Sequence, residues 1–222
     1  MSSGTLLRFA RKLALLLLAT LPLIHAPAEA ADDPYESLLA AVVKRDLPTV
    51  RNLIVRGMDV DTVDKDGNTL LMLASRAGSE EVAAYLVEAG AGLDRRNRYG
   101  ETSLMLAAIN GRLQMCKMLI DNDAEFDHDG WNPLIYAATN GHDSIVALLL
   151  TLDVDIDAAS DNGTTALMMA AGGGHLSTVK LLVRNGADLD RRNEARLTAT
   201  QWALKHGHPE VAKALKDAGA TR

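Results

Sequence analysis

The chain has 222 residues, of which 48% are hydrophobic and only 4% aromatic, and its formal net charge at pH 7 is −6. It can therefore bury a substantial core, but from small and branched aliphatic side chains rather than from rings. The acidic balance argues against nucleic acid and anionic lipid as partners, because both repel a negative surface. The single cysteine, Cys116, excludes an intrachain disulfide.

Residues 1–30 show the three zones of a secretory signal peptide. The basic residues Arg8, Arg11 and Lys12 precede an apolar run over 13–24, and small residues end at Ala30. Such a run is too short for an uncleaved membrane anchor, which needs about 20 apolar residues, so we expect cleavage after Ala30. The remainder has 20 basic and 28 acidic residues, a net charge of −8. We expect a periplasmic or secreted product without stable membrane insertion.

A sequence pattern then repeats with steps of 33, 30 and 33 residues. It opens on Gly67, Gly100, Gly130 and Gly163, each followed by Thr or Asn and a leucine, an alanine pair or near pair, a second glycine, and an apolar segment such as 145–150. The Thr or Asn suits the cap of a first helix. The second glycine suits a left-handed turn between antiparallel helices. Helix pairs at this period stack into a solenoid in which each unit contacts only its neighbours.

These segments resemble the ankyrin repeat, whose pattern runs G-x-T-P-L-H-x-A-A, then G-H, then a Val/Leu-rich helix, then G-A-D. Gly186-Ala187-Asp188 and Asn140-Gly141-His142 match it closely, and the resemblance extends from about Asp33 to Ala220. It implies an all-α solenoid of helix-turn-helix units with short β-hairpin fingers, about six repeats including two degenerate caps. We assign 1–30 to the signal peptide and 31–222 to the repeat domain, with caps at 33–64 and 193–222 and repeats at 65–96, 97–126, 127–159 and 160–192.

The third repeat departs from the pattern. The connection before Gly130 is three residues shorter than its counterparts, which accounts for the step of 30. We expect a stunted finger and a notch at this place in the row.

No residue pattern indicates catalysis or a cofactor. The chain has no Gly-rich phosphate loop, no paired carboxylates and no Ser-His-Asp spacing outside the repeat pattern, so we predict a non-enzyme. His142, His175 and His208 recur at one repeat position, where turn packing and hydrogen bonding are expected rather than metal binding. The aspartate clusters lack the residues of a calcium loop, and Cys116 aligns with small apolar residues, which favours burial. We predict neither a metal site nor a cofactor.

The resemblance implies a protein-protein interaction module that holds its partner in a concave groove. We expect a monomer that acts in the bacterial envelope as a scaffold, an accessory, or an inhibitor of the immunity type. The alternative is a metal-binding or redox-sensing envelope protein that uses His206, His208 and Cys116.

In the family, partners contact the hairpin tips and the outer ends of the first helices. The matching candidates here are Lys65, Asp66, Asn68, Arg76, Arg98, Tyr99, Glu101, Asn110, His128, Asp129, Trp131, Asn140, Asp161, Asn162 and His206. Tyr99 and Trp131 are the expected anchors, because aromatic residues often dominate interface energy. Trp131 has an alternative role, which is to fill the notch of the shortened finger.

The phrase Leu-Asp-Arg-Arg-Asn occurs twice, at 93–97 and 189–193, near the bases of two fingers. It gives an acidic protein two basic spots, extended by Arg98 and Arg196. These arginines either receive acidic side chains of a partner or pair with neighbouring aspartates.

Overall fold

The computed structural model describes residues 33–128 and 130–221. The predicted signal peptide and Asp129 lie outside these ranges. Tyr35–Arg222 forms one compact unit.

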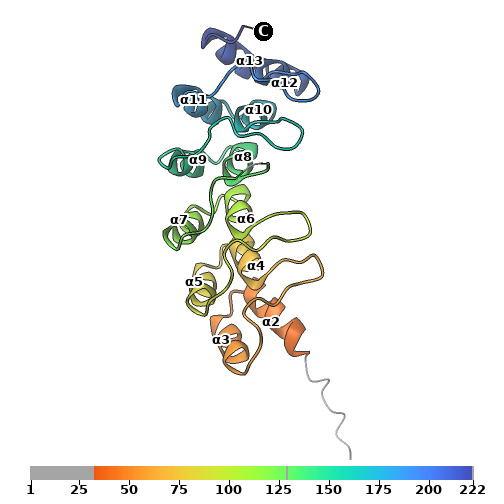
Figure 1. The fold of residues 1–222 in the computed structure, drawn as a ribbon, viewed down its shortest axis with the longest axis vertical. Helices are drawn as coiled ribbons and strands as arrows, with labels where there is room; N and C mark the ends of the chain where they lie inside the picture. The colour runs from red at the N-terminus through yellow and green to blue at the C-terminus, as the bar shows by residue number, and fades with distance from the viewer. Residues whose placement is uncertain (1–32, 129, 222) are drawn as a thin grey trace, which may run out of the picture. The chain divides into compact units, whose positions relative to one another are not determined.

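The described residues contain twelve α-helices, which follow one another as six helix pairs (Figure 1). We call the first helices of the pairs the inner row and the second helices the outer row. The inner row is α2 (Pro34–Val43), α4 (Leu70–Ala77), α6 (Ser103–Ile109), α8 (Pro133–Thr139), α10 (Ala166–Gly172) and α12 (Ala199–Lys205). The outer row is α3 (Leu47–Val55), α5 (Glu80–Glu88), α7 (Leu113–Asp121), α9 (Asp143–Leu149), α11 (Leu176–Arg184) and α13 (Pro209–Asp217). The predicted all-α solenoid is confirmed.

The inner helices begin where the sequence predicts. The side chain of the residue before each of the five inner helices α4, α6, α8, α10 and α12 accepts a hydrogen bond from the backbone N–H three residues on, which satisfies one of the free donors of the first turn. These caps are Thr69, Thr102, Asn132, Thr165 and Thr198. The glycines that follow the inner helices, at positions 78, 111, 141, 174 and 207, all have φ between 67° and 85°. The predicted left-handed turns are therefore confirmed.

A continuous apolar core runs through the stack between the two rows. The alanine pairs of the inner row, such as Ala107-Ala108 and Ala137-Ala138, are completely buried. Short side chains at these positions let neighbouring inner helices approach closely, and the inner helices pack on one another more tightly than the outer ones do. The outer row closes the core with branched side chains such as Val82 and Leu86.

The recurring histidines lie in the turns, as expected. A Cβ at Gly111 would lie 2.7 Å from the ring of His142, and a Cβ at Gly141 would lie 2.5 Å from the ring of His175. The Nε2 atom of His142 also lies 3.0 Å from the carbonyl oxygen of Ile109. Each imidazole thus covers the turn glycine of the preceding pair and ties two repeats together.

The predicted β-hairpin fingers are reduced in the structure. The described residues contain no strand, only two isolated antiparallel bridges, Val63 to Thr69 and Ala159 to Thr165. Each long finger is closed by side-chain hydrogen bonds together with a few backbone bonds, such as that from the N–H of Asp64 to the carbonyl oxygen of Asn68 (2.9 Å), which are too few to form a strand.

Candidate protein-binding surface

The loops that join consecutive helix pairs are the fingers of the stack. By repeat register they are finger 1 (59–68), finger 2 (92–101), finger 3 (125–131), finger 4 (155–164) and finger 5 (188–197). Finger 3 is three residues shorter than the others, as the sequence predicts.

A polar side chain three residues before the tip closes each of the four long fingers. In finger 1 the Oδ1 atom of Asp64 accepts hydrogen bonds from the N–H groups of Asp66 (2.9 Å) and Asn68 (2.8 Å). In finger 2 the Oδ1 atom of Asn97 accepts from the N–H groups of Tyr99 and Glu101, both at 2.9 Å. Equivalent bonds close fingers 4 and 5 through Ser160 and Asn193.

The environment of the finger 1 turn also shifts the pKa of its closing residue, Asp64. Burial raises the pKa of the Asp64 carboxyl, but hydrogen bonds from the side chain and backbone of Asn68 and from the backbone of Asp66 outweigh burial. The pKa of Asp64 therefore lies below its ordinary value, and the carboxylate form closes the turn.

Fingers 1 and 2 are bonded to one another, and so are fingers 4 and 5. The N–H of Arg98 donates to the carbonyl oxygen of Asp66 (3.1 Å), and the N–H of Glu194 donates to that of Asn162 (2.9 Å). The contact is close, since a Cβ at Gly67 would lie 3.3 Å from the backbone nitrogen of Arg98. We call these two units the finger pairs, and their backbone bonds fix the tips that they carry.

The prediction that Asn68 lies on an open tip is wrong. Its side chain is only 4% exposed. The Nδ2 group donates to Oδ2 of Asp64 and the Oδ1 atom accepts from Nδ2 of Asn97, both at 2.8 Å. Asn68 joins the two fingers of the first pair, because its position faces the next repeat rather than solvent.

The two Leu-Asp-Arg-Arg-Asn phrases make the same intramolecular contacts. Nη1 of Arg95 lies 3.6 Å from Oδ2 of Asp61, and Arg96 donates to the carbonyl oxygen of Gly100 at 2.9 Å. In finger 5 the equivalents of these arginines, Arg191 and Arg192, donate to the carbonyl oxygens of Asp157 (3.0 Å) and Arg196 (2.7 Å). The predicted pairing with a neighbouring aspartate carboxylate is therefore seen for Arg95 only, whereas Arg96, Arg191 and Arg192 bind backbone carbonyl oxygens of the stack.

The exposed arginines that remain at the tips are Arg98 and Arg196. Arg196 occupies the tip position at which the other fingers carry glycine, and its φ is +58°. Only glycine adopts this left-handed conformation without steric cost. Sequence reasoning noted Arg196 as a basic residue but missed its place in the glycine register.

In finger 3 an aromatic pair takes the place of a long turn. Trp131 remains 38% exposed, while its ring packs edge-on against Tyr136 with the centroids 5.5 Å apart. The Tyr136 hydroxyl donates to Oε1 of Glu101 at 3.1 Å, and burial together with the Glu101 carboxylate raises the pKa of Tyr136. Trp131 therefore fills part of the notch and still presents a ring edge to solvent.

The other predicted contact residues differ in accessibility. Tyr99 is the most open of the aromatic candidates, at 73% exposed. Asp66, Glu101 and His128 are half-buried, and both carboxylate oxygens of Glu101 accept hydrogen bonds, from Asn97 and from Tyr136. Asp129 lies outside the described residues. The exposed candidates, in addition to Arg98, Tyr99 and Trp131, are Lys65, Arg76, Asn110, Asn140, Asp161, Asn162 and His206.

Sequence reasoning missed Trp202 on α12. A Cβ at Gly172 would lie 2.3 Å from the Trp202 ring, so the ring covers this glycine. The His206 ring lies 4.8 Å from the Trp202 ring, and Lys205 Nζ lies 5.2 Å from its centroid. The run of glycines at 172–174 was the available signal, because it leaves space where sister repeats carry side chains.

The residues of the alternative function lie in ordinary structural settings. Cys116 is completely buried, and burial raises the pKa of its thiol to about 12, which leaves almost no reactive thiolate at neutral pH. His206 Nδ1 lies 2.8 Å from the carbonyl oxygen of Trp202. His208 Nδ1 lies 3.8 Å from Oε1 of Glu210. Across 33–128 and 130–221, no three His, Cys, Asp or Glu residues come together as a metal site.

We call the exposed tips together with the exposed ends of the inner row the finger surface. It offers Arg98 and Tyr99 on a hydrogen-bonded turn and Trp131 on a finger that ring packing holds. Arg, Tyr and Trp are the residue types that most often dominate protein interfaces. Within the described part of the chain, no helix has the length and apolar character needed to cross a membrane.

Comparison with known proteins agrees with this architecture. A family model described as ankyrin repeats (3 copies) matches residues 16–97, 37–129, 89–160 and 134–221. Comparison with curated protein sequences gave no significant match. Among solved structures, the human ASB11 ankyrin repeat domain superposes with a TM-score of 0.76 at 26% identity, over 83% of this chain and 84% of that one.

A second solved structure is similar over nearly the whole of its matched chain. It is the predatory endopeptidase Bd0816 from Bdellovibrio bacteriovorus in complex with the immunity protein Bd3460, with a TM-score of 0.70 and 30% identity, over 82% of this chain and 97% of the matched chain. Stacked helix pairs, left-handed glycine turns, capped inner helices and the family match lead to one conclusion: this chain belongs to the ankyrin-repeat family.

Proposed function

We propose that this protein is a non-catalytic binding module of the bacterial envelope that holds a protein partner on its finger surface. The observation that carries the proposal is the rigid presentation of an exposed aromatic residue. Tyr99 is 73% exposed, yet its own N–H is bonded to Asn97 and its finger is bonded to finger 1. Because the backbone that carries Tyr99 is already fixed, only the side chain loses conformational freedom on binding.

The charges at the tips favour a partner with acidic side chains opposite the first finger pair. Lys65 is exposed on finger 1, and Arg98 is exposed on finger 2 next to Tyr99. The arginine guanidinium donates two parallel hydrogen bonds to one carboxylate, and this bidentate geometry adds specificity to the electrostatic attraction. Repeat proteins use extended surfaces of this kind for binding.

An inhibitor of the immunity type is the specific version that we propose. Its support is the similarity to a chain of the endopeptidase–immunity protein complex, at 30% identity over 82% of this chain. The signal-like pattern of residues 1–30 supports an envelope location. Both statements are open to direct measurement.

The experiment is affinity capture from an envelope fraction with the tagged wild-type protein and with the Tyr99→Ala/Arg98→Ala variant. We expect one partner to be retained by wild type and lost, about tenfold or more, from the variant. Lys117→Ala, an exposed lysine of the outer row, is the matched control and should retain it. Equal retention by the finger variant and wild type would show that the finger surface is not the binding site.

Two further measurements test the finer parts of the proposal. Edman sequencing of the protein from a periplasmic fraction should begin at Ala31. Titration of the captured partner with the wild-type chain should lower a hydrolytic activity of that partner in a saturable way if the chain is an inhibitor. A partner whose activity does not change would favour a scaffold or accessory instead.

A further inference from the structure

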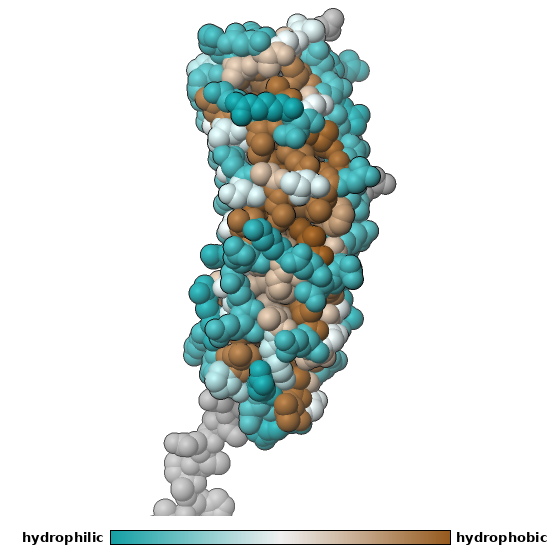
Figure 2. Space-filling model, turned by 90° about the vertical axis from the view of Figure 1, so that its left-hand side faces the viewer, coloured by the Kyte–Doolittle hydropathy of each residue, from teal (hydrophilic) through white to brown (hydrophobic). Residues whose placement is uncertain are grey.

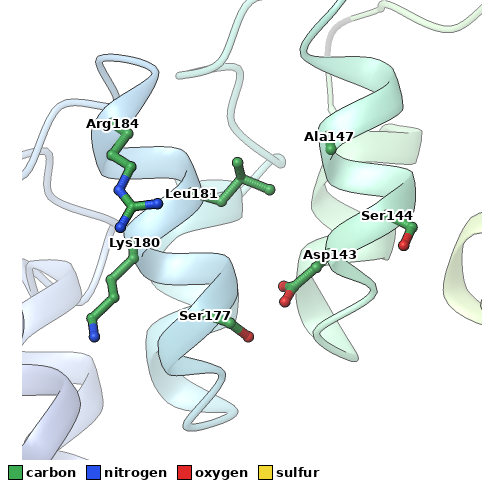
Figure 3. A pocket seen from close by; sticks show the side chains of 7 residues that line it. All are labelled: Asp143, Ser144, Ala147, Ser177, Lys180, Leu181 and Arg184. Atoms are coloured by element: carbon green, nitrogen blue, oxygen red, sulfur yellow. The ribbon is translucent and has the colours of Figure 1, made fainter.

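A groove of about 480 Å³ opens between the outer-row helices α9 and α11, away from the fingers. Figure 3 shows its lining, with Leu181 of α11 directed toward α9 and the cationic residues on the α11 side. The residues that line it are Asp143, Ser144, Ala147, Ser177, Lys180, Leu181 and Arg184.

The groove exists because a small residue stands where the first repeat has a long one. Between α3 and α5 the Arg51 guanidinium lies over the Tyr85 ring, 4.8 Å from its centroid. In repeat register, Ala147 occupies the position of Arg51 and Leu181 that of Tyr85. The side chain that fills the gap between α3 and α5 is thus missing between α9 and α11.

The open charges on the rim are positive. Lys180 and Arg184 lie one turn apart on α11 and are both exposed, and their side chains form no hydrogen bond or ion pair with another residue that the structure describes. The equivalent residues of α13, Lys213 and Asp217, form an ion pair at 2.5 Å. On the opposite rim, Asp143 accepts a hydrogen bond from the Thr178 hydroxyl at 2.5 Å. The groove therefore has two exposed cations on one rim and one half-buried carboxylate, Asp143, on the other.

The surroundings of the groove are apolar. Figure 2 views the molecule from the side of the outer row and shows hydrophobic surface gathered over its upper half, while hydrophilic surface dominates the lower half. Leu148, Leu150, Leu152 and Val183 are only partly buried against the core in this region. An apolar surface flanked by cations is suited to an amphipathic helix with acidic flanks.

We propose that the α9–α11 groove is a second docking surface, which binds an amphipathic helix of a protein partner that carries carboxylates beside aliphatic side chains. Lys180 and Arg184 receive the carboxylates, and Ala147 and Leu181 contact the apolar side chain. Because this surface lies on the outer row, the protein would hold two partners at once, one on the fingers and one on the groove.

The test uses two fluorescent synthetic helical peptides of about 14 residues, or four turns. Both carry leucines at i, i+4 and i+7, and the flanking positions are Glu in one and Lys in the other. Fluorescence anisotropy with the full chain after signal removal should show saturable binding of the Glu peptide only. Lys180→Glu with Arg184→Glu should weaken this binding about tenfold or more, while Lys117→Glu on α7, the matched control, should not.

The variant Ala147→Arg distinguishes binding that depends on the shape of the groove from binding that depends on surface charge alone. This variant restores the side chain that fills the equivalent gap at Arg51 and adds a positive charge to the rim. If the groove binds the helix, Ala147→Arg abolishes binding in spite of the added charge. Stronger binding of the Glu peptide to Ala147→Arg would show that only surface charge is at work and would overturn the proposal.

Two other outcomes also overturn it. One is the absence of Glu-peptide binding to wild type, with circular dichroism showing a folded chain. The other is a concentration-dependent dimer in sedimentation that Ala147→Arg abolishes, because a second copy would then occupy the groove. Tyr99→Ala should leave peptide binding unchanged, so a failure of the finger surface is distinguishable from a failure of the groove.

Discussion

The finger pairs and finger 3 are held in place by different interactions. In the first pair, Asn97 closes its own turn and also reaches Asn68 of the preceding finger. Finger 3 has Asp127 at the same place, but its Oδ2 atom accepts from the N–H of Asp155 in the next finger, at 3.4 Å. With three residues fewer, finger 3 depends on the contact between Trp131 and Tyr136 instead. Loop length thus decides whether hydrogen bonds or ring packing holds a finger.

Removing the central amide of the first finger pair should have the largest effect on stability. Asn97→Ala leaves the buried Asn68 Oδ1 and two backbone N–H groups without their partner. Buried unpaired groups cost about 1–3 kcal/mol each, and partial relaxation brings the expected loss to about 2–4 kcal/mol. Urea denaturation measures it. Asn193→Ala, which loses one side-chain hydrogen bond to Leu197, should cost about 1 kcal/mol, and equal losses would refute the difference.

In finger 3, the free energy of unfolding should depend on an aromatic ring rather than on an amide side chain. Trp131→Ala removes the edge-on contact with Tyr136, and we expect a loss of about 1–2 kcal/mol in the free energy of unfolding. Tyr99→Ala, on a hydrogen-bonded finger, should stay within about 0.5 kcal/mol of wild type. Trp131→Phe should recover part of the loss. The idea fails if the Tyr99 variant is as unstable as the Trp131 variant in the same denaturation series.

The two finger pairs differ at one tip, where a glycine should improve the second. Arg196→Gly relieves the left-handed backbone at φ +58° and keeps the carbonyl that accepts from Arg192. We expect a gain of about 0.5–1 kcal/mol, read as a higher melting temperature. Arg98→Gly, at a tip residue outside the left-handed region, is the control and should not stabilise the protein.

Acid should weaken the first finger pair through Asp64. Because its pKa is lowered in the folded protein, its contribution is complete above the ordinary carboxyl pKa of about 4 and is lost as the pH falls through the lower folded value. As the pH is lowered from 5 to below the folded pKa of Asp64, the midpoint of urea unfolding should therefore fall less in Asp64→Asn than in wild type. Asp161→Asn, an exposed aspartate of finger 4, should keep the wild-type slope.

Much of this fold could be predicted from the spacing of a few residue types. Tip glycines, Thr and Asn caps, alanine pairs and turn glycines recur with the period of the repeat, and each acts within one or two turns of helix. The shortened finger 3 was also predictable, because a missing three residues changes the period directly. These features are local, so the sequence displays them.

The candidate binding surface was less predictable, since its geometry depends on contacts between repeats. Asn68 has the spacing of a tip residue, but its amide faces the next finger. Arg95 and Arg96 look like free cations, but they bind a carboxylate and a carbonyl of the stack. The packing of Trp202 could be recognised only in the structure, where its ring occupies the space that Gly172 leaves. The α9–α11 groove likewise required the comparison of Arg51 with Ala147 across three repeats.

The turn glycines covered by imidazole rings have a consequence for how this protein can evolve. A side chain at Gly111 or Gly141 would meet both a strained backbone and the ring of the next repeat. Tyr99 and Arg98, in contrast, project from finger 2 into solvent. The tip of finger 2 can therefore change without loss of the scaffold, whereas the turns tolerate almost no substitution. Under the proposed function, recognition and architecture then depend on separate positions of the same repeat.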